Sequence, residues 1–281
     1  MTPNDRAGER RHVLITGASS GIGEAVAYEY ARRGARLALF ARRRERLGDV
    51  AERCRALGAS EALVLPGDTT VRADVDATAR RLEEAWPRID RAFLNAGTSF
   101  GIDRAGSRTH HLECCSSGSV TAADFSADVF ERVMRVNVIG VVYWLEPLFR
   151  RMRAQGKGRI AVTGSLAADR PLPRSSAYST SKSAIRALVE SLRYDACRLG
   201  IQLCLIEPGF VETADADPSR YVMPFLEPVD RAAGRIFAGV EAGARVIRFP
   251  WQASWLSRLI SVAPRPLYEK WVDRVLENGR E

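Results

Sequence analysis

The sequence predicts an α/β fold in which one doubly wound, parallel sheet of seven strands is covered by helices on both faces. Short apolar runs alternate with helical patterns along the chain, and the runs are apolar throughout, as in strands buried on both faces. No Gly/Ser/Pro linker interrupts the 281 residues, of which 46% are hydrophobic, so we expect one domain over residues 1–281.

Seven runs supply the expected strands in chain order. They are His12–Thr16, Arg36–Ala41, Ala62–Leu65, Ala92–Leu94, Arg159–Thr163, Ile201–Ile206 and Arg245–Phe249. Helices are expected from Gly21 to about Arg33, over Ala127–Gln155, and from Tyr178 to near Gly200. Two more are expected after the second and third strands, ending at about Leu57 and about Trp86. Right-handed crossovers between such units place helices on both faces of the sheet.

Composition and charge exclude several classes of protein. The net charge is +8, but the arginines are dispersed among 34 acidic residues, so the sequence indicates no nucleic-acid-binding arm. The apolar run Val138–Leu145 is too short for a membrane span. Residues 1–11 form a polar extension without the apolar core of a secretory signal, and the five irregularly spaced cysteines favour reduced thiols. We therefore expect a cytoplasmic protein.

Tyr178 and Lys182 form the first candidate catalytic pair. On a helix they lie one turn apart on the same face, and an ammonium beside a phenol lowers the pKa of that phenol toward working pH. Ser165, at the end of the strand Arg159–Thr163, can hydrogen-bond the same substrate oxygen. The pattern predicts that serine orients the oxygen and tyrosine transfers its proton. A packing role for Tyr178 is the alternative.

A glycine-rich turn follows the first expected strand and predicts a site for a dinucleotide. Glycines let the backbone approach a pyrophosphate, and the amides at the start of the next helix meet its charge. The residues concerned are Gly17, Ser19, Ser20, Gly21, Ile22 and Gly23.

Arginines follow the second expected strand, at the position where dinucleotide folds contact the adenosine ribose. Arg42 and Arg43 come directly after Ala41, where a carboxylate would accept a bond from the 2′-hydroxyl of NAD(H). Arginine instead makes bidentate, charge-assisted bonds to a 2′-phosphate. The sequence therefore favours NADP(H) over NAD(H), with a merely charged helix start as the alternative.

Together these motifs resemble the short-chain dehydrogenase/reductase family, in its compact Rossmann-fold subclass. The resemblance runs from about His12 to Thr213. It rests on Thr16-Gly17-x-x-x-Gly21-x-Gly23, Asn95-Ala96-Gly97, Asn137, Ser165, Tyr178-x-x-x-Lys182 and Pro208-Gly209.

The resemblance implies roles for further residues. Asn137 would extend a proton relay through water to Lys182, which would also bind the nicotinamide ribose. Asp68 would contact the adenine, and Thr69 would also belong to the cofactor site. The rest of the cofactor would contact Asn95, Ala96, Gly97, Tyr178, Pro208, Gly209, Val211 and Thr213. The family also implies a homodimer or homotetramer through the long helices near Val136 and Ala187.

Two regions depart from the family pattern. The inserted loop, residues 98–120 with its excess at Gly101–Ser119, holds His110, His111, Cys114 and Cys115. Adjacent ligand pairs point apart, so we expect a loop near the active-site mouth and no metal, with zinc as the alternative. Residues 214–281 form a variable region for substrate or subunit contacts. Its apolar residues are individually expected to pack in the core; these are Tyr221–Phe225, Trp251, Trp255, Leu256, Leu259 and Ile260. The alternatives are a cover over the substrate, a contact with another subunit, and a basic helix over Trp251–Val262 that lies on a membrane.

The sequence therefore predicts an NADP(H)-dependent oxidoreductase that transfers a hydride between nicotinamide and a carbonyl or secondary alcohol with an apolar body. A cofactor-binding sensor or scaffold without turnover is the alternative. The intact Ser165, Tyr178 and Lys182 set argues against that alternative.

Overall fold

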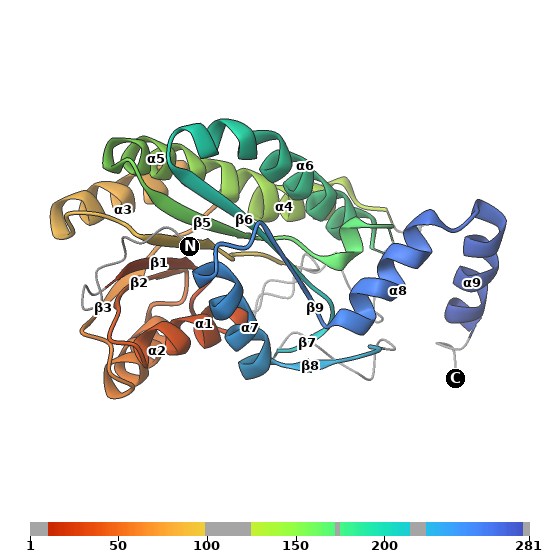
Figure 1. The fold of residues 1–281 in the computed structure, drawn as a ribbon, viewed down its shortest axis with the longest axis horizontal. Coiled ribbons are helices and arrows are strands. Elements are labelled where there is room, and N and C mark those ends of the chain that lie inside the picture. The colour runs from red at the N-terminus through yellow and green to blue at the C-terminus, as the bar shows by residue number, and fades with distance from the viewer. Residues whose placement is uncertain (1–10, 99–124, 172–174, 214–222, 278–281) are drawn as a thin grey trace.

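A parallel sheet of seven strands lies at the centre of the computed structural model, which describes residues 11–98, 125–171, 175–213 and 223–277 (Figure 1). The strand order is β3-β2-β1-β4-β5-β6-β9. The strands are β1 (His12–Thr16), β2 (Arg36–Ala41), β3 (Glu61–Pro66), β4 (Arg91–Leu94), β5 (Gly158–Thr163), β6 (Ile201–Pro208) and β9 (Val246–Phe249). All seven expected strands are confirmed, with ends shifted by a few residues at most.

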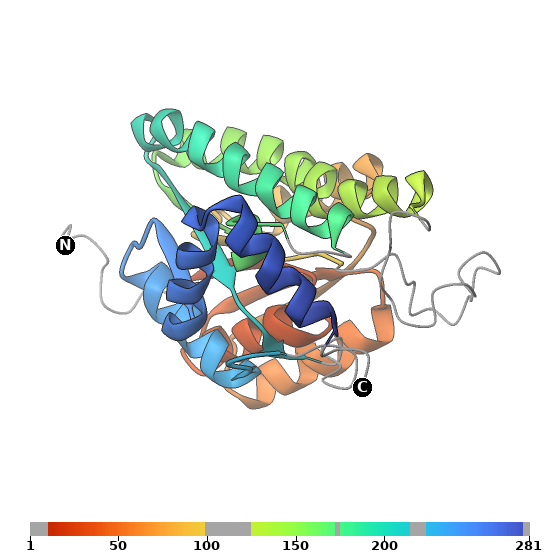
Figure 2. The same ribbon diagram turned by 90° about the vertical axis from the view of Figure 1, so that its right-hand side faces the viewer.

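Helices cover both faces of this sheet, as the apolar runs predict (Figure 2). One face carries α1 (Gly21–Ala31), α2 (Arg44–Ala56) and α7 (Val229–Glu241). The other carries α3 (Arg72–Ala85), α4 (Ala127–Met134), α5 (Gly140–Gln155) and α6 (Ser176–Arg198). Helices α8 (Trp251–Val262) and α9 (Arg265–Glu277) follow β9 and lie beyond the end of the sheet (Figure 1).

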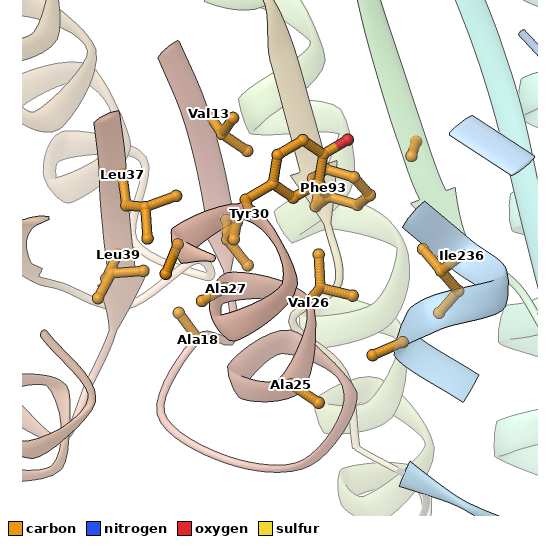
Figure 3. Close-up of a cluster of buried hydrophobic side chains, with 14 of the residues drawn as sticks. Val13, Ala18, Ala25, Val26, Ala27, Tyr30, Leu37, Leu39, Phe93 and Ile236 are labelled. Atoms are coloured by element: carbon orange, nitrogen blue, oxygen red, sulfur yellow. The ribbon is translucent and has the colours of Figure 1, made fainter. Parts of the chain in front are cut away.

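The core on the α1 face shows why these runs fold as strands. Val13 of β1 and Phe93 of β4 point toward Tyr30 and Val26 of α1, and Ile236 of α7 closes the cluster (Figure 3). The rings of Tyr30 and Phe93 meet edge to face, with centroids 5.4 Å apart. Burying each large apolar side chain contributes about 2 kcal/mol, so strands apolar on both faces are held between two helix layers.

Strand β1 pairs with β2 on one side and β4 on the other, and the strand order reverses there. In open α/β sheets such a switch point leaves a crevice at the carboxyl ends of the strands. The glycine turn after β1, Asn95 after β4 and Ser165 after β5 all lie at this edge.

Two features differ from the expected elements. The helix predicted over Ala127–Gln155 is divided by η1 (Arg135–Ile139), a π-helical segment between α4 and α5. A two-stranded sheet also pairs β7 (Val211–Glu212) with β8 (Glu227–Pro228). Two-residue strands are too short to leave a periodic signal, and a π-turn preserves the apolar pattern of the helix around it.

The expectation that the C-terminal apolar residues pack in the core is wrong for Phe225, which is 47% exposed, and for most of those on α8, while Tyr221 and Val222 lie outside the described residues. Trp251, Trp255 and Leu259 are each more than 60% exposed, and Leu256 is 39% exposed. On α8, small side chains face inward instead, where Ser254 is buried. Among the described helices, none is both long and apolar enough to cross a bilayer.

Candidate active site

Ser165 and Tyr178 are brought together from two separate elements. Ser165 follows β5 and begins the short 3₁₀ turn η2 (Leu166–Ala168), where its Oγ accepts a hydrogen bond from Ala167 N at 3.1 Å. Tyr178 lies in the first turn of α6, where the nearby Ser165 side chain acts to lower the pKa of its hydroxyl. A substrate oxygen placed at this pair meets two hydroxyl groups that can orient it and exchange a proton with it.

Lys182 lies one turn after Tyr178 on α6 and is buried. Its Nζ donates to the carbonyl oxygen of Thr163 at 2.8 Å and lies 5.6 Å from the centroid of the Tyr178 ring. Burial lowers the pKa of Lys182 to about 8. The ammonium is therefore still mostly charged at neutral pH and is held by the end of β5.

Burial raises the pKa of Tyr178, and the hydrogen bond from Ser165 opposes that rise. The expected net lowering of this pKa by Lys182 is not observed in the protein alone. The physical reason is that desolvation by burial disfavours the phenolate, while the lysine ammonium lies over the ring, 5.6 Å from its centroid. The Tyr178 hydroxyl is therefore protonated at neutral pH.

Asn137 lies in the π-helical segment η1 and is 1% exposed. Its Oδ1 accepts from Thr98 N at 2.8 Å, and its Nδ2 donates to Thr98 O at 2.9 Å and to Ser181 Oγ at 3.0 Å. Ser181 in turn donates to the Tyr178 carbonyl at 2.7 Å. Asn137 thus connects the strand-β4 loop to the Tyr178 helix. π-turns within helices are frequent at functional sites.

The glycine turn fits a dinucleotide because it leaves no room for side chains. Gly17 has φ +65° and packs on Ala96, whose Cα would be 2.8 Å from an added Cβ. A Cβ at Gly23 would lie 2.4 Å from the Gly17 carbonyl oxygen. The backbone is thus bare where a pyrophosphate would approach the start of α1, as in known dinucleotide turns.

Asn95 and Ala96 are fixed against this turn. Thr16 Oγ1 accepts from the backbone N of Asn95 at 3.0 Å and of Ala96 at 3.1 Å. The Asn95 Oδ1 accepts from Thr163 Oγ1 at 3.1 Å. Gly97 is the next residue, and an added Cβ there would lie 3.3 Å from Asn137 Oδ1 and 3.7 Å from Lys182 Nζ. The Asn-Ala-Gly segment therefore joins the glycine turn to Lys182.

Arg43 crosses from the end of β2 to the glycine turn. Its Nη2 donates to Ser19 Oγ and to Ser20 Oγ, both at 2.9 Å. Arg42 and Arg43 are exposed, so both lie open to solvent at the turn where the resemblance places the adenosine ribose. A guanidinium and two hydroxyl groups form a donor set suited to a phosphate.

The remaining expected cofactor residues divide into two groups. Asp68 Oδ1 accepts from Thr70 N and Oγ1, each at 2.8 Å, and Thr69 Oγ1 donates to the Gly140 carbonyl at 3.3 Å. These contacts are those of a strand-end turn, and an adenine contact of Asp68 stays a prediction.

The second group, Pro208, Gly209, Val211 and Thr213, follows or ends β6. The Gly209 amide donates to the carbonyl of Phe249 at 2.7 Å. The Thr213 methyl lies 3.2 Å from the position of an added Cβ on Gly21, so this group reaches the glycine turn.

The inserted loop lies outside the described residues, and with it His110, His111, Cys114 and Cys115. Within the described ranges no group of three or more His, Cys, Asp or Glu side chains is arranged to hold a metal ion. Zinc in the loop therefore stays an open alternative.

Sequence reasoning missed Thr163, Ser181 and Thr98, which hold Lys182, Asn95 and Asn137 in place. Thr163 and Thr98 act wholly or partly through backbone groups, and a sequence pattern carries no signal for a carbonyl. Ser181 directly precedes Lys182, and only the fold reveals its contact with Asn137.

Comparison with known proteins agrees with this geometry. A family model described as short chain dehydrogenase matches residues 11–221. The 11-beta-hydroxysteroid dehydrogenase-like 3 protein of Arabidopsis thaliana is 35% identical over 265 residues, which are 91% of this chain and 78% of that protein.

Two solved structures are similar over nearly their full length. A short-chain dehydrogenase from Sphingobium yanoikuyae in complex with NADPH has a TM-score of 0.73 at 27% identity and covers 91% of this chain and 97% of its own. A short chain dehydrogenase/reductase from Burkholderia phymatum in complex with NAD has a TM-score of 0.76 at 24% identity, with coverages of 89% and 92%, and supports the fold. Because the family match spans most of the sequence and a relative above 30% identity covers nine-tenths of it, this chain belongs to the short-chain dehydrogenase family.

Proposed function

We propose that this member of the family is an NADP(H)-dependent oxidoreductase that transfers a hydride between nicotinamide and a carbonyl or secondary alcohol with an apolar body. The observation that carries the proposal is the convergence of Ser165 and Tyr178, with Lys182 buried one turn away, at the same sheet edge as the glycine turn. A protein that only binds cofactor has no chemical need for this set.

In the mechanism that we propose, the chain positions oxygen and supplies its proton. Bound nicotinamide would donate or accept the hydride, which no side chain can supply. Ser165 orients the substrate oxygen by a hydrogen bond, and Tyr178, protonated because burial raises its pKa, gives its proton to that oxygen during reduction. In oxidation the proton returns to Tyr178.

Lys182 and Asn137 support this proton transfer in our proposal. Lys182, with a pKa of about 8, places positive charge beside the phenol as negative charge develops there, and it would hold the nicotinamide ribose when cofactor is bound. Asn137, hydrogen-bonded to Thr98 and Ser181, would connect Lys182 through water to a proton relay. Gly17, Ser19, Ser20, Gly21, Ile22 and Gly23 would hold the pyrophosphate.

The preference for NADP(H) rests on Arg43 and its two serines. A 2′-phosphate placed between Arg43, Ser19 and Ser20 would receive charge-assisted bonds, whereas a 2′-hydroxyl would gain little from the guanidinium. Related structures contain either cofactor, since the Sphingobium yanoikuyae enzyme is bound to NADPH and a xylitol dehydrogenase to NAD⁺. Exposed Arg42 would provide a second cation.

An apolar substrate body is supported by the relatives. Several of them are named 11-beta-hydroxysteroid dehydrogenases or as similar to one, and a steroid is a largely apolar alcohol or ketone. We further propose that the chain is one domain and that the subunit contact implied by the family is made by the long helical region near Val136, where η1 joins α4 to α5, and by α6 near Ala187. A cytoplasmic location is supported by the free thiols of Cys54, Cys197 and Cys204.

Tyr178→Phe tests the proposal. We expect turnover on a panel of aldehydes, ketones and secondary alcohols, followed by nicotinamide absorbance, to fall 10²- to 10⁴-fold, because the proton donor is lost. Cofactor affinity, measured by NADPH fluorescence, should change less than threefold. Tyr194→Phe, an exposed tyrosine on the same helix, is the matched control and should keep full turnover. Cofactor binding without turnover by the unaltered protein on the whole panel would favour the sensor instead.

A further inference from the structure

Helix α8 is oriented opposite to an ordinary surface helix, with small polar side chains inward and large apolar side chains outward. Ser254 Oγ accepts from Arg248 Nε at 2.9 Å, and Ser257 Oγ donates to Asp169 and to the Leu166 carbonyl. The C-terminal end of α8 is fixed by Arg170, whose Nη1 donates to the carbonyls of Ile260 at 2.9 Å and Ala263 at 2.7 Å. Polar contacts on one side therefore hold α8 to the body of the protein.

The outward side of α8 carries what we call the α8 apolar stripe, defined as Trp251, Trp255, Leu259 and Val262. These side chains are 64%, 67%, 68% and 78% exposed, respectively. Their spacing of four, four and three residues places them on one side of the helix, over a length of about 16 Å. On α9, Leu267 is 61% exposed and Trp271 is 36% exposed.

The exposed apolar area is the size that a protein interface needs. Side chains of this size at these exposures leave on the order of 600 Å² of apolar surface on α8. Stable interfaces begin at about 600 Å² buried on each partner. Patches of this size on a single chain mark interaction sites.

The charges around the stripe favour a protein partner over a lipid surface. The described cations of these two helices outside residues 273–277 are Arg258, Arg265 and Lys270, and Arg265 is paired with Glu269 at 2.8 Å. Helices that lie on anionic membranes carry a polar face rich in Lys and Arg. The polar side of α8 carries one cation, Arg258, and serines of which Ser254 and Ser257 already bond to the rest of the protein.

The stripe matches itself when a second copy is turned by a twofold axis. Antiparallel pairing about an axis near the middle of α8 sets Trp255 opposite the partner's Leu259, and Trp251 opposite the partner's Val262, to within about one residue. Each large ring then meets a smaller aliphatic side chain, as interdigitated helix packing requires. A twofold contact uses the same surface on both copies, so no other partner is needed.

We infer that the α8 apolar stripe is a contact between two copies of this chain. It lies on a different part of the molecule from the helical regions near Val136 and Ala187 that are proposed for the family-type contact (Figure 2). Two distinct twofold contacts on one chain close into a tetramer when their axes meet at right angles. The inference does not depend on the proposed catalytic function, because the experiments below measure the mass of the assembly in solution and not turnover.

The first experiment removes the stripe. The double variant Trp255→Ser/Leu259→Ser changes two exposed side chains, so the fold is expected to persist, as circular dichroism and Tm would verify. Sedimentation velocity from about 1 to 100 µM should show the assembly mass falling by half relative to the unaltered protein. Val71→Ser, a 44% exposed apolar residue ahead of α3, is the matched control and should leave the mass unchanged.

The second experiment tests the antiparallel arrangement. Trp255→Glu and Leu259→Lys should each halve the mass when alone. When they are mixed, each new charge faces its opposite across the twofold axis, and the mass should recover. Binding to lipid is tested by mixing the unaltered protein and the double variant with vesicles that contain phosphatidylglycerol.

A monomer at every concentration, a mass unaffected by the stripe variants, or failure of the mixture to recover would overturn the inference. Binding of the unaltered protein to the vesicles, lost in the double variant without any change of mass in solution, would likewise overturn it and assign the stripe to lipid.

Discussion

Gly23 shows how the glycine turn depends on a single missing side chain. An added Cβ would lie 2.4 Å from the Gly17 carbonyl oxygen and 2.7 Å from Asn95 Nδ2, and Asn95 is itself held by Thr163. An alanine at this position would push the backbone of the glycine turn away from Asn95. We therefore expect Gly23→Ala to weaken NADPH binding more than tenfold and to lower the free energy of unfolding. Fluorescence titration and urea unfolding measure both.

Gly234→Ala on α7 is the control for Gly23→Ala, because a Cβ there would meet no atom within 4 Å. It should stabilise the protein by about 1 kcal/mol through helix propensity alone. Equal changes in NADPH affinity and stability for the two substitutions would contradict the proposed role of the glycine turn in cofactor binding.

Asp90 carries a pH-dependent part of the stability. Burial raises its pKa, but hydrogen bonds from His12 and the Arg88 charge outweigh burial and hold the pKa at about 2. A carboxyl group whose pKa is depressed by folding stabilises the protein above its ordinary pKa of 3.8, and this stability is lost as the pH falls toward 2.

We therefore expect Asp90→Asn to remove about 2 kcal/mol at pH 6 and almost nothing at pH 2. Urea unfolding across this pH range gives the two curves. Parallel curves at all pH values would show that the Asp90 carboxylate is not stabilised by folding.

At the scale of elements, a buried ion cluster joins the segments that carry the active site. Asp169 follows the Ser165 turn, Arg186 lies one turn after Lys182 on α6, and Glu207 precedes the Pro208-Gly209 turn. Arg248 on β9 bonds both acids, with Nη1 at 2.7 Å from Glu207 Oε2. Arg186 bonds them as well, with Nε at 2.6 Å from Glu207 Oε1 and Nη1 at 2.7 Å from Asp169.

Removing one cation from this cluster leaves buried carboxylates undercompensated. Burial already raises the pKa of Glu207, with Arg186 and Arg248 acting against the rise. We expect Arg248→Met to lower the free energy of unfolding by about 3–5 kcal/mol. Arg265→Met, which breaks the exposed Arg265–Glu269 pair, should change it by less than about 0.5 kcal/mol. Urea unfolding that gave similar values for both would refute the importance of the cluster.

At the scale of the whole molecule, cofactor binding links the separate segments at the sheet edge to global stability. A ligand present at 100 times its Kd stabilises the folded state by about 2.7 kcal/mol, which raises the Tm by roughly 5 °C for a chain of this size. If Arg43 and its serines receive a 2′-phosphate, NADPH at a given concentration should raise the Tm more than NADH does.

Arg43→Leu should remove most of the difference in Tm shift between NADPH and NADH. Arg44→Leu, which makes the same charge change one residue along the chain, should keep it. Calorimetry with both cofactors measures all three proteins. A larger shift with NADH in the unaltered protein would reverse the proposed preference.

The sequence by itself determined the order of strands and helices, the glycine turn and the positions of Ser165, Tyr178 and Lys182. These follow from local rules, since apolar periodicity fixes buried faces and i, i+4 spacing puts Tyr178 and Lys182 on one side of a helix. The family resemblance adds Asn137, but not the π-helical segment that holds it.

Only the tertiary structure decided which distant groups meet. The Thr163 carbonyl that holds Lys182 and the four-residue ion cluster both join segments far apart in the chain. The packing of α8 on the rest of the protein likewise decides that the α8 apolar stripe faces outward. Burial also outweighed the local Tyr178–Lys182 spacing in setting the Tyr178 pKa. The physical reason is that desolvation and long-range contacts depend on what the whole fold places around a residue, and neighbouring letters of the sequence do not specify this.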